Sequence, residues 1–145
     1  MFTHILIPTD GSHLSSSALD RSLGFAREIG ARATVLTVIE PFHLFSLAPE
    51  QVSDTRDEYR QHAARHAQEI LDAAERNARD KHVDCGVLHV THEHPDQAIL
   101  TAALNRGCDL IAMASHGRRG ITALMLGSVT MKVLAQAKIP VLVYR

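Results

Sequence analysis

One stretch of the sequence decides the fold: Leu110-Ile111-Ala112-Met113-Ala114-Ser115-His116-Gly117, then nine residues, then Gly127-Ser128. Its apolar first part predicts a buried strand, and residues 129–137 after it predict a helix. The glycines near the two ends of the intervening loop allow the backbone to turn sharply and to approach a ligand closely. The stretch therefore predicts a strand, a ligand loop and a helix in succession.

The same alternation of strand and helix runs through the whole chain. Short apolar runs predict strands at 5–7, 33–39, 83–91, 110–113 and 140–144. Helical periodicity predicts helices from Ser12 or Ser15 to Gly30, from about residue 50 to 81, from Pro95 to Gly107, and at 129–137. In the long second helix the expected buried stripe is Tyr59, Ala63, Ala67, Ile70, Leu71 and Ala74. This pattern predicts an α/β fold with a parallel sheet covered by helices on both faces.

The expected ligand segments meet at one edge of this sheet. Ligands of such folds bind at the C-terminal ends of the strands, where the strand order reverses. The first and fourth predicted strands form that point, and they are followed by Thr9-Asp10-Gly11-Ser12 and by residues 114–127. Residues 42–49 show no pattern and are expected to form a loop; whether residues 42–58 act as a lid is open.

The residues of these loops predict a phosphate site. Amide groups at the start of a helix have no partner within the helix and attract anions, and the Ser128 hydroxyl adds a donor there, unless it is only a helix cap. Arg118 and Arg119 either clamp outer phosphates or are solvated. His116 either contacts phosphate or metal or shapes the loop. Asp10 either binds the nucleoside part of a ligand or fixes its own turn.

Composition indicates an ordinary globular protein and narrows the classes of partner. The 145 residues predict one domain, 1–145, with 46% hydrophobic residues and a net charge of −1. This charge balance gives no reason to expect a nucleic-acid partner, and no apolar run is long enough for a membrane span. Cys85 and Cys108 are expected to be free thiols in a reducing compartment, and the cytoplasm is the expected location.

Histidines and missing motifs limit the chemistry. His62 and His66 are one helical turn apart, and His89, His92 and His94 cluster near a strand end, but none has a recognisable metal-ligand spacing, so no metal site is predicted. The chain has no P-loop motif, no Gly-x-Gly-x-x-Gly fingerprint and no Gly-x-Ser-x-Gly elbow. No residue stands out as a general base, so no catalytic residue is assigned.

Taken together, these motifs resemble the universal stress protein family over the whole chain. The opening Ile-Leu-Ile-Pro-Thr-Asp-Gly-Ser at 5–12 is similar to the first strand and loop of that family. Residues 113–128 are similar to its nucleotide signature, Gly-x-x-Gly, nine residues, then Gly-[Ser/Thr]. The closing Lys-Ile-Pro-Val-Leu-Val at 138–143 is similar to its last strand.

The resemblance implies a three-layer Rossmann-like fold of the adenine nucleotide alpha hydrolase type, with a five-stranded parallel sheet in the order 3-2-1-4-5. It also implies ATP, with or without Mg²⁺, as the ligand, and a homodimer through the last strand, 141–144. Asp10 would meet the nucleoside, main chain near Val38 would meet adenine, and the glycine loop would hold the phosphates. The candidate nucleotide-binding residues are Pro8, Thr9, Asp10, Val38, Met113, Ala114, His116, Gly117, Arg118, Gly127, Ser128 and Val129.

Two departures from the family pattern leave alternatives open. Ala114 stands where the signature has its first glycine, which disfavours a positive φ and could press on the ribose, and Glu93-His94 stand where a glycine often precedes the helix. The leading hypothesis is an ATP-binding regulatory dimer that an unknown protein partner reads. The alternatives are a stress protein that binds no nucleotide and acts through protein contacts, or a slow ATPase, autokinase or adenylyl-transferring enzyme. An apolar last strand at the sheet edge supports dimerisation independently, unless a loop covers it or Lys138 and Arg145 protect it.

Overall fold

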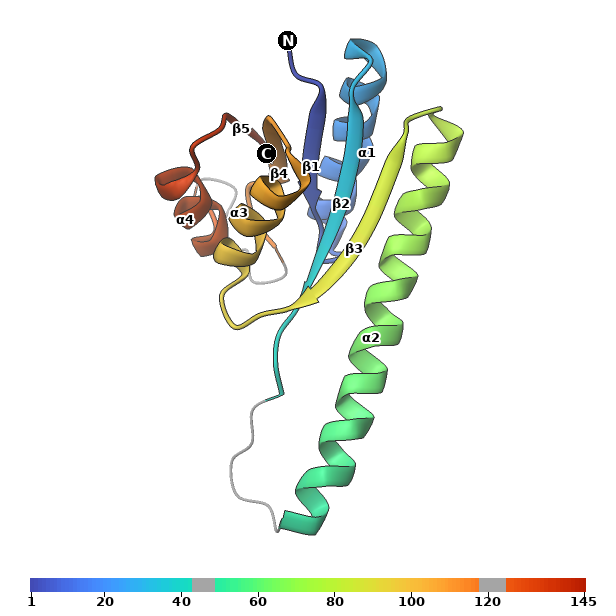
Figure 1. Cartoon of the computed structure of the whole chain (residues 1–145), viewed down its shortest axis with the longest axis vertical. Helices are drawn as coiled ribbons and strands as arrows, with labels where there is room; N and C mark the ends of the chain where they lie inside the picture. The colour runs from blue at the N-terminus through green and yellow to red at the C-terminus, as the bar shows by residue number, and fades with distance from the viewer. Residues whose placement is uncertain (43–48, 118–124) are drawn as a thin grey trace.

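The computed structural model describes residues 1–42, 49–117 and 125–145, with the backbone alone at 49–54. Strands and helices alternate in it as expected (Figure 1). The strands are β1 (His4–Pro8), β2 (Arg32–Ile39), β3 (Cys85–Thr91), β4 (Leu110–Ala114) and β5 (Val141–Tyr144). The helices are α1 (His13–Ile29), α2 (Pro49–Asp80), α3 (Pro95–Arg106) and α4 (Ser128–Gln136).

The five strands form one parallel sheet in the order β3-β2-β1-β4-β5, which confirms the predicted fold and strand order. β1 lies between β2 and β4, so the chain leaves β1 toward one edge of the sheet and later returns on its other side. This reversal of strand order places the loops after β1 and β4 next to each other.

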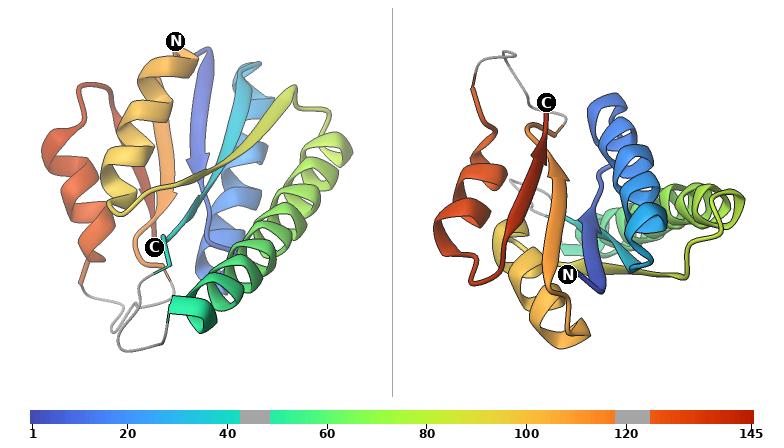
Figure 2. Two further views of the ribbon diagram at one scale, coloured as in Figure 1. Left: turned by 60° about the horizontal axis from the view of Figure 1, so that its bottom comes forward. Right: turned by 90° about the horizontal axis from the view of Figure 1, so that it is seen from above.

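Helices cover both faces of the sheet, as the two views of Figure 2 show. On one face Leu23 of α1 and Leu71 of α2 pack on alternate residues of the central strands, such as Ile5 and Ile7. On the other face α3 and α4 pack on the residues between them, such as Leu6. Because strand side chains alternate in direction, the unbroken apolar run at 5–7 in β1 supplies apolar residues to both faces and produces this three-layer packing.

The N-terminal part of α2 extends past the sheet, which corrects the expected buried stripe (Figure 1). Ala67, Leu71 and Ala74 are buried as predicted, but Tyr59 is 36% exposed. The sequence pattern continues along the helix while the sheet beneath it ends, so Tyr59 has no strand to pack against. It lies beside the loop after β2 instead, where its hydroxyl donates to the carbonyl of Glu40 at 2.9 Å.

Other element ends differ from prediction for local reasons. The third strand begins at Cys85 rather than Val83, because the residues after Asp80 form the turn that ends α2. His82 takes a left-handed φ of 57°, and the Val83 amide bonds back to the Ala78 carbonyl at 2.9 Å. Ser12, not Ser15, is the N-cap of α1, since its hydroxyl accepts from the Ser15 amide. The interior of the expected loop after Phe42 lies outside the described residues.

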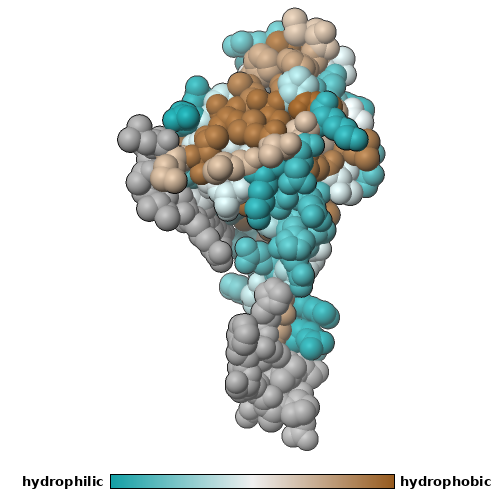
Figure 3. Space-filling model, turned by 90° about the vertical axis from the view of Figure 1, so that its left-hand side faces the viewer, coloured by the Kyte–Doolittle hydropathy of each residue, from teal (hydrophilic) through white to brown (hydrophobic). Residues whose placement is uncertain are grey.

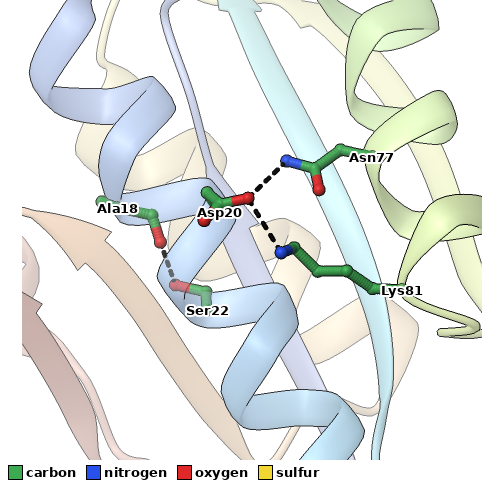
Figure 4. Close-up of polar contacts among 5 residues, drawn as sticks. All are labelled: Ala18, Asp20, Ser22, Asn77 and Lys81. Atoms are coloured by element: carbon green, nitrogen blue, oxygen red, sulfur yellow. Dashed lines mark hydrogen bonds and ion pairs between the residues drawn. The ribbon is translucent and has the colours of Figure 1, made fainter.

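A polar contact joins α1 to the end of α2 on the surface (Figure 4). Asp20 accepts from Lys81 Nζ at 3.0 Å and from Asn77 Nδ2 at 3.2 Å. The Lys81 hydrogen bond lowers the pKa of Asp20, but the aspartate is 56% exposed. Solvent screening therefore limits the contribution of this pair to about 1 kcal/mol or less.

Candidate functional site

A cavity of about 630 Å³ lies at the C-terminal edge of the sheet. The ends of β1, β2 and β4 form its floor, and α2 and the first turns of α3 and α4 form its walls. A cavity of this size is in the range that holds a cofactor or a drug-sized ligand.

The cavity brings together the predicted site residues that the structure describes. Eleven of the twelve line it: Pro8, Thr9, Asp10, Val38, Met113, Ala114, His116, Gly117, Gly127, Ser128 and Val129. The twelfth, Arg118, and its neighbour Arg119 lie outside the described residues. Segments far apart in the sequence thus converge on one ligand-sized space.

Asp10 is held in position by the start of α1. Its Oδ1 accepts from the Ser12 amide at 2.9 Å and from Ser15 Oγ at 2.7 Å. The Ser15 hydroxyl also lies 3.1 Å from the hydroxyl of Thr9. The predicted turn-fixing role of Asp10 is therefore present, and the same bonds orient its carboxyl group in the cavity wall.

Gly117 lies directly against the Asp10 carboxyl group. A Cβ on Gly117 would stand 2.6 Å from Asp10 Oδ2, far inside a van der Waals contact. Gly117 is not among the glycines with positive φ, so conformational freedom is not what this position requires. The loop after β4 needs glycine here because it passes so close to the loop after β1.

Gly127 has a similar role at the start of α4. Its amide donates to the Ser115 carbonyl at 2.7 Å, and a Cβ on it would stand 3.2 Å from that oxygen. Its φ of −64° is ordinary, so the expected sharp turn is not what this glycine provides. Close backbone approach is the reason for a glycine at this position too.

The N-terminus of α4 opens into the cavity. Gly127 is the N-cap residue, so the alternative that Ser128 is only a helix cap is wrong, while its expected contact with phosphate stays a prediction. The first intrahelical bond runs from the Met131 amide to the Gly127 carbonyl, which leaves the amides of Ser128, Val129 and Thr130 ahead of the hydrogen-bonded turn. Such amides and the helix dipole favour an anion at this end of the cavity.

Ala114 is the last residue of β4, where the signature has a glycine. It is 6% exposed, and its carbonyl accepts from Thr130 Oγ1 at 3.0 Å. His82 is the one non-glycine with positive φ in the described ranges, so Ala114 has ordinary strand backbone. Its methyl group therefore causes no backbone strain, and the expected difficulty with φ does not arise.

His116 has a buried ring nitrogen to which no described residue is hydrogen-bonded. Its Nδ1 lies 2.8 Å from Ser115 Oγ, while its Nε2 is buried and has no hydrogen-bond partner among the described residues. The residue is 9% exposed and lines the cavity. A buried nitrogen that loses its water without gaining a partner costs free energy, so a ligand group at this position would satisfy it.

Sequence reasoning missed several lining residues. They come mainly from the end of β2 and from the helices: Ser15, Leu36, Thr37, Ile39, Glu40, Tyr59, Ala63, His66, Ala67, Ile70, Pro95, Asp96, Ile99, Thr130 and Lys132. Glu93 and His94, which the sequence marked as a departure from the family pattern, line the cavity too. The rule that ligands meet strand ends could have found Thr37 and Glu40, since β2 is next to β1. Asp96 carried no such signal; it is 5% exposed and accepts from Gln136 Nε2 at 3.1 Å.

The charged groups around the cavity are predominantly acidic. Asp10, Glu40, Glu93 and Asp96 contribute carboxyl groups, and Lys132 contributes an ammonium group. In the described part of the chain, no three His, Cys, Asp or Glu side chains are grouped so that they could hold a metal ion. The same part contains no helix that is both long and apolar enough to traverse a bilayer.

Comparison with known proteins points to one family. The profile of the universal stress protein family matches residues 1–145. Universal stress protein YxiE of Bacillus subtilis (strain 168) is 32% identical over 152 residues, covering 100% of both chains.

Solved structures agree with the sequence comparison. The structure of hypothetical protein MJ0577 superimposes with a TM-score of 0.82 at 26% identity, covering 99% of this chain and 95% of that one. MJ0577 of Methanocaldococcus jannaschii is also named a universal stress protein. A universal stress protein solved in complex with cAMP superimposes with a TM-score of 0.73 at 26% identity, covering 99% and 97% of the two chains.

Proposed function

The chain belongs to the universal stress protein family, and on that premise we propose that it binds ATP and acts as a regulatory homodimer of the stress response with little or no turnover. The observation that carries the proposal is the convergence of the predicted nucleotide residues on one cavity that the α4 N-terminus enters. A universal stress protein of the same fold was solved in complex with cAMP, which supports an adenine nucleotide as the class of ligand.

The cavity suits the parts of an adenine nucleotide in order. Val38 and the end of β2 offer main chain to the base, and the fixed carboxyl group of Asp10 offers an acceptor for ribose hydroxyls. Gly117 leaves room beside that carboxyl group. The amides of Ser128 and Val129 offer donors for phosphate oxygens.

One feature of the cavity fits a group that is not itself part of the chain: the Nε2 of His116 is buried and has no hydrogen-bond partner among the described residues. Four carboxyl groups in the walls disfavour a bare triphosphate, so Mg²⁺ that enters with ATP would reduce the repulsion. Asp10 orients the ligand, and His116 supplies a hydrogen bond to it.

The homodimer is proposed to form through β5. β5 pairs with β4 alone within the described sheet, and Figure 3 shows hydrophobic side chains gathered on the side that carries β5 and α4. Met131 and Leu134 of α4 are 56% and 41% exposed there. The carbonyls of Pro140 and Tyr144 accept from the amides of Ile111 in β4 and of Ser115 directly after it. Because strand backbone groups alternate in direction, those of Val143 face the open edge and can pair with a second copy.

The dimer has a direct test. Light scattering after size exclusion should give twice the chain mass of 15.9 kDa. Val143→Pro removes an outward amide and should give the single-chain mass with an unchanged circular dichroism spectrum. A single-chain mass for the unmodified protein would contradict the proposal.

Nucleotide binding is tested by calorimetric titration of nucleotide-stripped protein with ATP and Mg²⁺. We expect about one ATP per chain, and weaker binding in Gly127→Val, whose Cβ would crowd backbone atoms of Ser115 and His116. Gly24→Val is the matched control, because a Cβ on Gly24 meets nothing within 4 Å. Absence of binding heat in the unmodified protein would contradict the proposal and favour a stress protein that acts through contacts alone.

Slow ATP hydrolysis or autophosphorylation is the second candidate, and it is favoured by the imidazole of His116, whose Nε2 has no hydrogen-bond partner in the described part of the chain. Phosphate release over many turnovers, lost in His116→Gln, would support the enzyme.

We further propose a reducing compartment, the cytoplasm, because Cys85 and Cys108 are both free.

A further inference from the structure

A second cavity, of about 470 Å³, adjoins the first one between the ends of β2 and β3 and the N-terminal part of α2. It is formed by the end of β2 and the residues after it, by the exposed N-terminal part of α2, and by the end of β3. Its lining residues are Ile39, Glu40, Pro41, Phe42, Arg56, Tyr59, Arg60, Ala64, His89 and Thr91. None of the predicted nucleotide-binding residues is among them.

The cavity carries a concentration of cationic groups. Arg56 and Arg60 are four residues apart on α2, so their guanidinium groups share one face of the helix. His89 and Thr91 are two residues apart on β3 and face the same way as each other. The hydrogen bonds and ion pairs found within the described ranges include neither guanidinium group. Two like charges at this spacing repel each other, and an anion between them would remove that cost.

An aromatic wall adjoins the cationic groups. The rings of Phe42 and Tyr59 lie 5.1 Å apart at an interplanar angle of 42°. The Tyr59 hydroxyl donates to the Glu40 carbonyl at 2.9 Å, which holds the ring in place. A fixed aromatic surface beside two guanidinium groups suits a ligand that has both an apolar body and an anionic group.

We propose that this cavity is a second ligand site, which binds a small organic anion through Arg56 and Arg60 and packs its apolar or aromatic body on Phe42 and Tyr59. Guanidinium groups bind carboxylates and phosphates alike through paired hydrogen bonds, so the anionic group is one of these two. Glu40 in the wall repels a ligand that is anionic at that end, which orients the anionic group toward α2 and His89. The site adjoins the proposed nucleotide site, since Ile39, Glu40 and Tyr59 line both cavities, but Arg56, Arg60 and Phe42 line only the second one.

The test is an NMR titration of the full chain already saturated with ATP and Mg²⁺, so that the nucleotide cavity is occupied. Phenyl phosphate and benzoate are the probes. The control compounds are benzyl alcohol, which has the ring but no charge, and inorganic phosphate, which has the charge but no ring. We expect one or both probes to shift the amide signals of Tyr59, His89 and Thr91, and to bind more tightly than either control compound. The preferred probe identifies the anionic group.

Variants make the assignment specific. Arg60→Gln and Arg56→Gln should each weaken probe binding by about tenfold, the factor that one charge-assisted hydrogen bond supplies. Arg65→Gln is the matched control, because Arg65 is exposed on the same helix and lines neither cavity. Equal weakening by all three variants, equal binding of inorganic phosphate, or no shift at Tyr59, His89 and Thr91 would overturn the proposal. The titration is repeated in ATP-free protein with His89 and Thr91 as reporters, because these two residues line only the second cavity. Their shifts test this site whether or not ATP binds, so a failure of ATP binding is seen separately.

Discussion

Replacement of Gly117 by alanine should weaken ATP binding through its contact with Asp10. The new Cβ would stand 2.6 Å from Asp10 Oδ2, about 0.8 Å short of an ordinary contact at 3.4 Å. A shift of Oδ2 away from the new Cβ would distort the two bonds that Oδ1 of the same carboxyl group accepts from the Ser12 amide and Ser15 Oγ. A hydrogen bond to a charged group contributes about 1.5–3 kcal/mol, so loss of the oriented carboxyl group should reduce the affinity for ATP roughly 10- to 100-fold.

A double-mutant cycle by calorimetric titration tests this reasoning. Within the described residues, both heavy atoms that lie within 4 Å of the new Cβ belong to Asp10. In an Asp10→Ala background the collision disappears, and Gly117→Ala should cost less than about twofold in affinity. The same loss in both backgrounds would refute the steric account. Gly24→Ala is the control; it should leave affinity unchanged and raise stability by about 0.5–1 kcal/mol, because Gly24 lies within α1 with open space around it.

Three further predictions concern single residues. Ala114→Gly should change ATP affinity less than about twofold and lower the free energy of unfolding by about 1 kcal/mol, because Ala114 already has strand backbone; titration and urea denaturation measure both. Burial lowers the pKa of His4 below its ordinary value of 6.5. Below that pH, His4 therefore binds a proton more readily in the unfolded chain than in the folded one. Stability should therefore fall as the pH drops below 6.5, and thermal melts of His4→Gln should lack that part of the fall. Burial raises the pKa of the Cys85 and Cys108 thiols to about 11, so both should react with Ellman's reagent roughly a hundredfold more slowly than a free cysteine until the protein is unfolded; fast labelling of the folded chain would contradict their burial.

The strand order and the layers of this fold follow from local patterns. Apolar runs such as 5–7 and 110–113 fit only strands buried on both faces, and the family resemblance supplied their order. Element ends were less predictable. Val83 is β-branched, which favours a strand, although in the structure it lies in the turn between α2 and β3. The left-handed turn at His82, which no β-branched or glycine signal marked, decides where α2 ends.

Site residues that belong to a local sequence motif could be predicted. Contacts that depend on how distant segments pack together could not. Asp10 and Gly117 could be named from their motifs, but the reason for Gly117 could not, because the contact joins loops that are 107 positions apart in sequence. Tyr59 was placed in the core because periodicity along a helix does not show where the sheet beneath it ends. The cationic cavity behind it depends on β3 lying beside α2, which no local pattern encodes.

ATP binding at the C-terminal edge of the sheet would be seen in a crystal structure of the protein grown with ATP and Mg²⁺. We expect the base beside Val38, the ribose within hydrogen-bond distance of Asp10, and phosphate oxygens at the amides of Ser128 and Val129. Nucleotide density elsewhere on the molecule, or an empty cavity under conditions in which ATP binds stoichiometrically in solution, would contradict it.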